Sequence, residues 1–219
     1  MKSIPKELKK TITSVCSDLY DGFINASKEA LGKNIRIVID RFHIAKLYRN
    51  VVDNVRKQEM RKLKKALSDK EYAELKGVMW IVRKSDTNLS HKEKEIRDRL
   101  FTYSEKLKEV YESSKELTAI FDSETSRNGG IRRLNNWIKR VKESGITAFK
   151  TFITTLEKRT KEIANYFVSR ENSGFVEGLN NRIKVLKRRC YGIVDRVHLF
   201  RRISLDIGNS HPLPVQIHG

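Results

Sequence analysis

Three carboxylates in this 219-residue chain stand where a metal site could form. Asp18 and Asp40 each end a short run rich in β-branched residues, and Glu177 lies much later, in a stretch otherwise rich in cations. Carboxylate oxygens can hold a divalent cation beside a phosphate, which is the chemistry of phosphoryl transfer. Taken singly, Asp18 reads more simply as a helix N-cap and Asp40 as a turn residue. Taken as a pair, with Glu177, they favour a metal site.

The late acid lies in a basic amphipathic stretch, residues 173–192. Its apolar residues recur at helical spacing and form one stripe: Val176, Leu179, Ile183, Leu186 and Cys190. One flank of this stripe carries the polar set Glu177, Asn181, Lys184 and Arg188. We expect one helix that faces a core and presents a single acid beside amides and cations. On the pattern alone, an amphipathic helix with a solvated basic side is the simpler interpretation.

The two aspartates are positioned by a predicted strand–helix–strand unit. Residues 12–18 and 35–40 are typical of short strands, and the helical pattern between them stops at Gly32. Strands joined by a helix pair in parallel with a right-handed crossover. Ligands bind at the carboxyl ends of parallel strands, so we expect Asp18 and Asp40 at one edge of the sheet. His43 could orient Asp40 or contact a phosphate, although a lone histidine is more often structural.

The middle of the chain is predicted to be helical. Residues 47–121 have helical spacing with Lys and Glu on the outer faces, and further helices are expected within 131–168. Residues 85–91 and 122–130 read as loops, the second ending on two glycines. Trp137 lies among several cations and could stack on DNA bases. A core tryptophan on an amphipathic helix is the simpler interpretation.

Composition narrows the class of protein. The formal net charge of +19 calls for a polyanionic partner, with nucleic acid the first candidate and a membrane surface the second. No apolar run reaches 18 residues, and the first residues do not form a secretory signal. Two distant cysteines indicate a reducing cytoplasm and no zinc site. The absence of a P-loop, a GxGxxG motif and a serine nucleophile elbow gives no support to an NTPase or hydrolase.

These segments together resemble bacterial insertion-sequence transposases of the ISL-three type. The resemblance rests on residues 18–20, 37–46 (with Asp-Arg-Phe-His) and 173–184 (with Glu-Gly-Leu-Asn-Asn-Arg-Ile-Lys), followed by Lys187–Arg189 and Tyr191-Gly192. It covers nearly the whole chain. It implies an RNase H-like DDE domain in which three carboxylates hold two Mg²⁺ ions and DNA strands are cleaved and joined.

On this resemblance, Asp18 is the second acid and Glu177 the third, both as metal ligands, with Asp40 a residue near the site. The order of Asp18 and Asp40 stays open, although Asp18 fits the fourth strand of the fold better. The family's first aspartate lies on an upstream strand that this chain does not contain. We therefore expect an N-terminally truncated transposase that is inactive alone, although its full-length relative is an enzyme.

The expected fold is mainly α with a small β part. It would be an incomplete RNase H-like α/β core, consisting of the last two strands, interrupted by a large α-helical insertion. The expected boundaries are 1–48 for the partial core, 49–168 for the insertion, 169–208 for the returning helices with the glutamate motif, and 209–219 for a flexible tail.

The expected partner is DNA, as transposon ends and as target, and a second copy of the chain could also bind. No membrane contact is expected, and the protein would be cytoplasmic and nucleoid-associated when bound to DNA. Contacts should reach phosphates rather than read bases. The candidate DNA-binding residues are Arg41, His43, Lys46, Asn181, Arg182, Lys184, Lys187, Arg188 and Arg189.

The alternative is a non-enzymatic basic DNA-binding or architectural protein. The two hypotheses differ over the acids. A shared two-metal site requires the carboxyl groups of Asp18 and Glu177 to come within roughly 4–7 Å of each other. An architectural protein has no such requirement.

Overall fold

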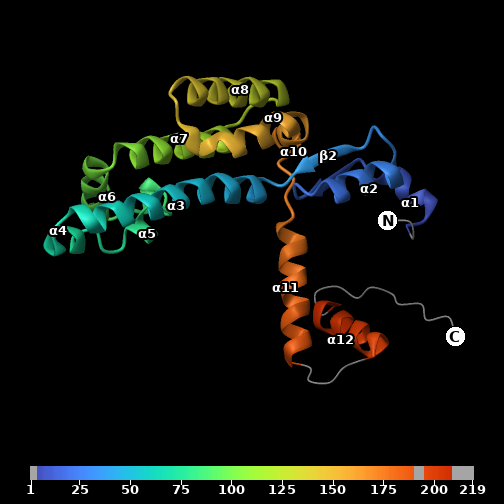
Figure 1. Cartoon of the computed structure of the whole chain (residues 1–219). Helices are drawn as coiled ribbons and strands as arrows, with labels where there is room; N and C mark the ends of the chain where they lie inside the picture. Colours follow the sequence, from blue (N-terminus) through green and yellow to red (C-terminus); the bar gives the residue numbers. More distant parts are fainter. Residues whose placement is uncertain (1–3, 190–194, 209–219) are drawn as a thin grey trace. The chain divides into compact units, whose positions relative to one another are not determined.

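The structure, a computed structural model, describes residues 4–189 and 195–208. The chain is mainly helical with one small parallel sheet, as the sequence predicts (Figure 1). It divides into two compact units, residues 1–172 and 173–219, and each is described by itself. Three features expected from the sequence lie outside the described residues: the tail 209–219, Cys190, and the pair Tyr191-Gly192.

The sheet of the first unit confirms the predicted strand–helix–strand pattern. After α1 (Lys6–Thr11), strand β1 (Ser14–Ser17) pairs in parallel with β2 (Arg36–Ile39), and α2 (Asp21–Leu31) connects them. Gly32 ends α2 with a φ of 101°, a conformation that favours glycine. Three apolar residues of β2 are fully buried, which explains the continuous run of branched side chains in this strand.

Helix α3 (Arg41–Ala66) begins directly after β2 and forms the spine of the first unit. The carboxylate of Asp40 caps it by accepting a hydrogen bond from the backbone N–H of Phe42 at 2.9 Å. Residues 48 and 49, between which the sequence places the start of the insertion, lie within this continuous helix. Its inner face packs into the core through Ile44, Tyr48, Val52, Val55 and Leu63.

Short elements lead from α3 to the next long helices: α4 (Asp69–Ala73), α5 (Val78–Ile81), the 3-10 turn η1 (Asp86–Asn88), α6 (His91–Tyr103) and α7 (Glu105–Asp122). Serine side chains start three of these helices. Ser68 and Ser90 form capping boxes with the glutamate three residues on, and Ser104 accepts from the N–H of Leu107. The predicted loop at 85–91 contains η1 and ends where α6 begins.

The last elements of the first unit are α8 (Arg127–Glu143), η2 (Thr147–Phe149), α9 (Lys150–Ala164) and α10 (Tyr166–Ser169). The prediction of a loop over 122–130 was wrong in its last part, because α8 already starts at Arg127. The hydroxyl of Ser126 caps the helix by accepting from the N–H of Gly129. Gly130 lies against the ring of Phe167, where a Cβ atom would come within 2.2 Å of ring carbon. The glycine therefore permits close packing instead of breaking the helix.

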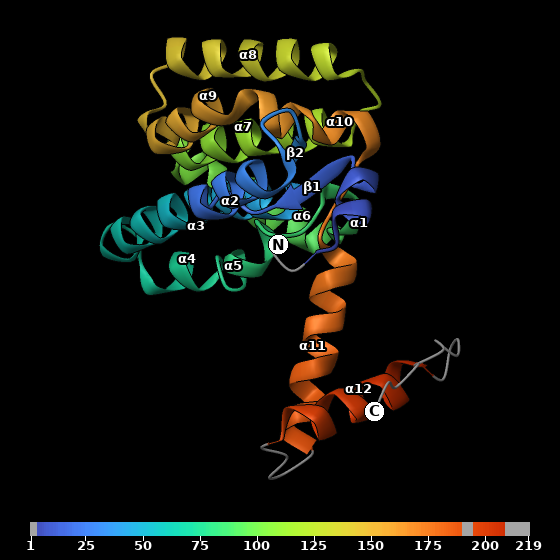
Figure 2. The ribbon, with the colours of Figure 1, turned by 90° about the vertical axis from the view of Figure 1, so that its right-hand side faces the viewer.

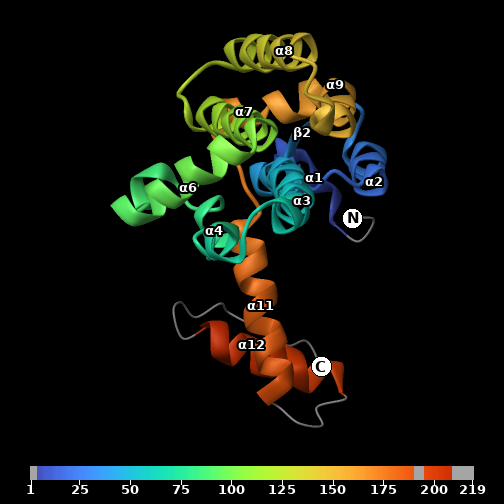
Figure 3. The same cartoon turned by 60° about the vertical axis from the view of Figure 1, so that its left-hand side comes forward.

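Helices α7, α8 and α9 pack in layers above α3, with α8 outermost (Figures 2 and 3). Trp137 of α8 is fully buried between these layers and donates its indole N–H to the carbonyl oxygen of Ser113 at 2.9 Å. This confirms the interpretation of Trp137 as a core residue. Asn165, at the end of α9, joins this helical layer to the sheet by donating its side-chain amide to the carbonyl oxygen of Ile37 at 2.7 Å.

The second unit contains α11 (Gly174–Arg189) and α12 (Arg196–Gly208), which confirms the predicted helix over the glutamate motif. Along its apolar stripe, Leu186 is buried, Leu179 and Ile183 are half-buried, and Val176 is exposed. Arg182 links the two helices through the backbone carbonyl and the carboxylate of Asp206. Within the described residues, no helix combines the length and apolar character needed to cross a membrane.

Candidate functional site

Asp18 and Asp40 lie side by side at the carboxyl edge of the sheet. Each directly follows its strand, and the last paired residues of those strands are Ser17 and Ile39. The backbone N–H of Asp40 donates to the carbonyl oxygen of Ser17 at 2.9 Å, which extends the ladder beyond β2. The two acids therefore occupy equivalent positions on neighbouring strands, where ligands bind in open α/β sheets.

The two carboxylates have different surroundings. Asp40 is 1% exposed, and its Oδ1 caps α3. Asp18 is half-buried, and its Oδ1 accepts from the backbone N–H of Tyr20 at 2.9 Å. In the described part of the chain, Oδ2 of Asp18 has no hydrogen-bond or ion-pair partner. Asp18 is thus the more accessible of the two acids. Asp40 caps α3, whereas the simpler interpretation made Asp40 a turn residue and Asp18 the N-cap.

The pKa of the Cys16 thiol, on β1, is affected by the negative charge at this edge of the sheet. Burial is the main reason that the pKa of its thiol rises from 9.0 to about 11, and the negative charges of Asp40 and Glu171 add to the shift. The thiol therefore stays protonated at neutral pH. A protonated thiol is a poor nucleophile.

The candidate residues after Asp40 differ in their freedom to bind DNA. Arg41 forms an ion pair with Asp122. Burial disfavours the charge of Arg41, but hydrogen bonds with Tyr166 and Asp122 outweigh burial and raise its pKa. His43 is half-buried with its ring edge-on to Phe42. The guanidinium of Arg41 is therefore paired within the protein.

Lys46 is the freest of these candidates. Its side chain is exposed and has no ion pair within the described residues. It lies on α3, between one and two turns past the cap at Asp40.

Glu177 lies in the first turn of α11, in the second unit, and its side chain is exposed. Its backbone N–H donates to the carbonyl oxygen of Ser173 at 2.9 Å. Of the candidate DNA contacts on α11, Arg182 is bound to Asp206. Among the described residues the remaining candidates are exposed and have no ion pair: Asn181, Lys184, Lys187, Arg188 and Arg189.

The chemistry of these donors fits Mg²⁺, although each unit offers only part of a site. Carboxylate oxygens are the ligands this ion prefers, and the free Oδ2 of Asp18 and the exposed carboxylate of Glu177 both suit it. No cluster of three or more His, Cys, Asp or Glu side chains that could hold a metal occurs in the described residues.

A cavity of about 460 Å³ opens beside the loop that follows Asp18. One wall consists of residues 19–21 and Leu47, and the other is the face of α9 that carries Lys158 and Arg159. Asp21 binds both cations, and hydrogen bonds from Lys158 and then Arg159 lower the pKa of its carboxyl. No sequence motif indicates these two cations, because Lys158 lies 137 positions from Asp21.

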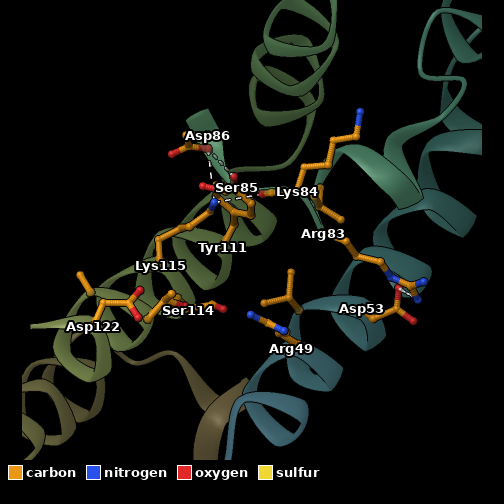
Figure 4. A pocket seen from close by; sticks show the side chains of 14 residues that line it. Arg49, Asp53, Arg83, Lys84, Ser85, Asp86, Tyr111, Ser114, Lys115 and Asp122 are labelled. Atoms are coloured by element: carbon orange, nitrogen blue, oxygen red, sulfur yellow. Dashed lines mark hydrogen bonds and ion pairs between the residues drawn. The ribbon is translucent and has the colours of Figure 1, made fainter. Parts of the chain in front are cut away.

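A second cavity, of about 360 Å³, lies between α3, residues 82–86 and α7 (Figure 4). All but one of its charged lining residues pair within the protein. Asp53 contacts Arg83 at 3.3 Å, and Asp86 accepts from the hydroxyl of Tyr111 at 2.8 Å. Within the described residues, Arg49 is the one charged lining residue that has no partner. We therefore interpret this cavity as a gap between packed helices.

The described residues thus contain a parallel βαβ unit with strand-end acids, several further helices, and a basic helix with one acid. A family model of the ISL3 type, described as transposase, matches residues 1–203. The chain belongs to this transposase family.

A curated relative shows the same relationship. The transposase for insertion sequence element IS1001 of Bordetella parapertussis is 28% identical over 204 residues, which cover 92% of this chain and 49% of the relative. The chain thus spans about half the length of that protein. No solved structure matches it.

Proposed function

We propose that this chain carries part of a two-metal site for DNA transposition, in which Mg²⁺-dependent phosphoryl transfer cleaves and joins DNA strands. The observation that carries the proposal is the position of Asp18. Its carboxylate lies at the carboxyl edge of a parallel sheet with one oxygen unpartnered among the described residues, in a chain of the transposase family.

In this proposal Asp18 and Glu177 hold the metal, and Asp40 is a positioning residue. When bound, the ions would activate the attacking oxygen and stabilise the leaving oxygen of the transfer. Asp40 fixes the start of α3 through its cap, and so fixes the edge on which Asp18 lies. Lys46 and the free cations of α11 would bind DNA phosphates.

We further propose that residues 49–168 are a helical insertion within a partial RNase H-like core, formed by 1–48 and 169–208. A site of this class uses three acids on a common framework. The two described strands provide Asp18 and Asp40, and Asp40 is committed to the cap of α3. We expect no strand cleavage or joining by the 219-residue chain alone.

Iron-directed cleavage of the polypeptide tests the metal site without relying on activity. Fe²⁺ replaces Mg²⁺ in oxygen-ligand sites and, with ascorbate and peroxide, cuts the backbone near the bound ion. We expect cuts in the purified chain near both residue 18 and residue 177, suppressed by excess Mg²⁺ and lost together in Asp18→Asn. A matched control, Asp98→Asn on α6, should leave the cuts unchanged. Cuts near only one of the two acids would overturn the shared site.

A second candidate function is supported by the exposed cations of α11. They favour DNA binding by the chain whether or not it holds a metal. Tight, salt-sensitive binding of duplex DNA without iron cleavage at residue 18 would support an architectural protein. Metal-dependent strand cleavage by the 219-residue chain would contradict the proposed inactivity.

A further inference from the structure

Helix α8 is unlike its neighbours in the charge of its exposed face. It contains six cations and one acid: Arg127, Arg132, Arg133, Lys139, Arg140 and Lys142, against Glu143. Helix α7, which packs against it, contains three lysines and five acids. A helix that is merely solvated can mix signs, as α7 does. The one-sided charge of α8 therefore calls for a specific explanation.

The core contacts of α8 determine which side of the helix faces solvent. Trp137, Leu134 and Val141 are buried against α7 and α9, so the opposite side of the helix faces solvent. That side carries Arg132, Asn136 and Lys139 at successive helical turns, flanked by Arg133 and Asn135, and all five are exposed. The helix forms the outer layer of the first unit (Figures 1 and 3).

Of the cations at the centre of this face, Lys139 forms an exposed ion pair with Glu143 of the same helix at 3.8 Å, whereas the two arginines have no acidic partner among the described residues. Arg140 and Lys142, on the flanks, bind Glu116 and Glu157 of the neighbouring helices. In the described part of the chain, Arg132 and Arg133 have neither an ion pair nor a hydrogen-bond partner for their side chains. The flanking pairs thus fix the helix, and the central arginines remain available.

We propose that the exposed face of α8 is a second DNA-binding surface, which contacts the phosphates of duplex DNA. Arg132 and Lys139 are about 10 Å apart along the helix axis, a span over which cations can reach more than one phosphate. Asn135 and Asn136 add hydrogen-bond donors suited to the same oxygens. The surface lies in the first unit, on a different helix from the cations of α11.

This inference rests on the proposed function only in taking DNA as the polyanion. It is tested by binding of the full 219-residue chain to a labelled duplex as the salt concentration varies. For Arg132→Gln with Arg133→Gln, we expect roughly a tenfold loss of affinity, and a slope of log K against log salt reduced by about two, because two phosphate contacts are lost. Arg132→Lys with Arg133→Lys should retain most of the binding, since phosphates need only the charge.

The matched control removes two exposed lysines from α6, Lys92→Gln with Lys94→Gln, with the same change in net charge. We expect less than about a twofold loss, because acids surround these lysines. Equal losses in the α8 and α6 variants, or an unchanged salt slope, would overturn the α8 surface. If Lys187→Ala with Arg188→Ala weakens binding while the α8 variant does not, the α8 surface fails and the proposed contacts of α11 stand. A parent chain that binds no duplex at all would defeat both.

Discussion

The backbone N–H of Asp40 donates to the carbonyl oxygen of Ser17 at 2.9 Å, one residue beyond the last paired position of β2. This bond places Asp40 beside Asp18 at the edge of the sheet while the side chain of Asp40 turns inward to cap α3. One strand end thus offers an accessible acid, and the other offers a buried acid that fixes the following helix. The two positions should respond differently to mutation.

Replacing Asp40 should cost stability, whereas replacing Asp18 should not. Asp40→Ala removes the N-cap of a 26-residue helix, and we expect the free energy of unfolding to fall by about 1–2 kcal/mol. Asp40→Asn retains the cap and should lie within about 0.5 kcal/mol of the parent, as should Asp18→Ala. Urea denaturation followed by circular dichroism measures these differences. An Asp18→Ala variant less stable than Asp40→Ala would contradict the assigned roles.

The local parts of the fold could be predicted from the sequence, because their causes are local. The branched residues of 35–39 predict a buried strand, and the helix before it predicts parallel pairing, which is observed. Two ion pairs, Arg41–Asp122 and Arg36–Glu171, join residues that are 81 and 135 positions apart in the sequence. Such pairs depend on how the helices stack, and no short-range spacing encodes them.

The start of α8 shows how tertiary contacts override a local signal. Two adjacent glycines normally indicate a loop. Here the cap of Ser126 supports the first turn, and the close approach of Phe167 to Gly130 favours glycine inside the helix. The location of Asp18 and Asp40 at one sheet edge was likewise predictable, whereas the different burial of the two carboxylates was not. That difference arises because a long helix starts directly after β2.

Gly130→Ala should destabilise the first unit despite the better helix propensity of alanine. The added Cβ would lie 2.2 Å from the ring of Phe167, so the ring or the helix must move. We expect a loss of about 1–3 kcal/mol, measured by urea denaturation. In a double-mutant cycle with Phe167→Leu, the two changes should couple by at least about 0.5 kcal/mol, because the smaller side chain relieves the clash. Additive effects would show that the contact does not limit packing.

The two tryptophans should differ sharply. Trp137→Phe leaves the carbonyl oxygen of Ser113 without its indole donor in a buried site, which should cost about 1–3 kcal/mol. Trp80 is 62% exposed, so Trp80→Phe should cost less than about 0.5 kcal/mol. Acrylamide should quench the remaining fluorescence of Trp137→Phe strongly and that of Trp80→Phe weakly. Similar quenching in both variants would contradict the burial of Trp137.

The lowered pKa of Asp53 should make the free energy of unfolding depend on pH. Burial disfavours its charge, but hydrogen bonds from Lys57 and Arg56, with the charge of Arg83, lower the pKa from 3.8 to about 2. A lowered pKa means that the folded state binds the proton more weakly than the unfolded state. The ionised form therefore stabilises the fold above about pH 4, and this contribution is lost as the pH falls towards 2.

Asp53→Asn tests this dependence. The variant should be less stable than the parent at pH 7, and the difference should shrink as the pH falls from about 4 to about 2. The neutral change Asn54→Ala, one residue along the same helix, should show a difference that does not vary over this range. Denaturation curves at each pH give the free energies of unfolding. A difference for Asp53→Asn that grows in acid would have the wrong sign.

The exposed cations of α11 should bind DNA without regard to sequence. Lys187 and Arg188 lie in the last turn of the helix, and among the described residues neither is paired with an acid. Contacts of this kind reach phosphates, which every duplex offers equally. Lys187→Ala with Arg188→Ala should weaken binding to unrelated duplexes by the same factor and reduce the salt slope by about two. Fluorescence anisotropy with two duplexes of different sequence measures both quantities, with Lys92→Ala and Lys94→Ala together as the control. A change in the preference between the duplexes would instead assign base contacts to these residues.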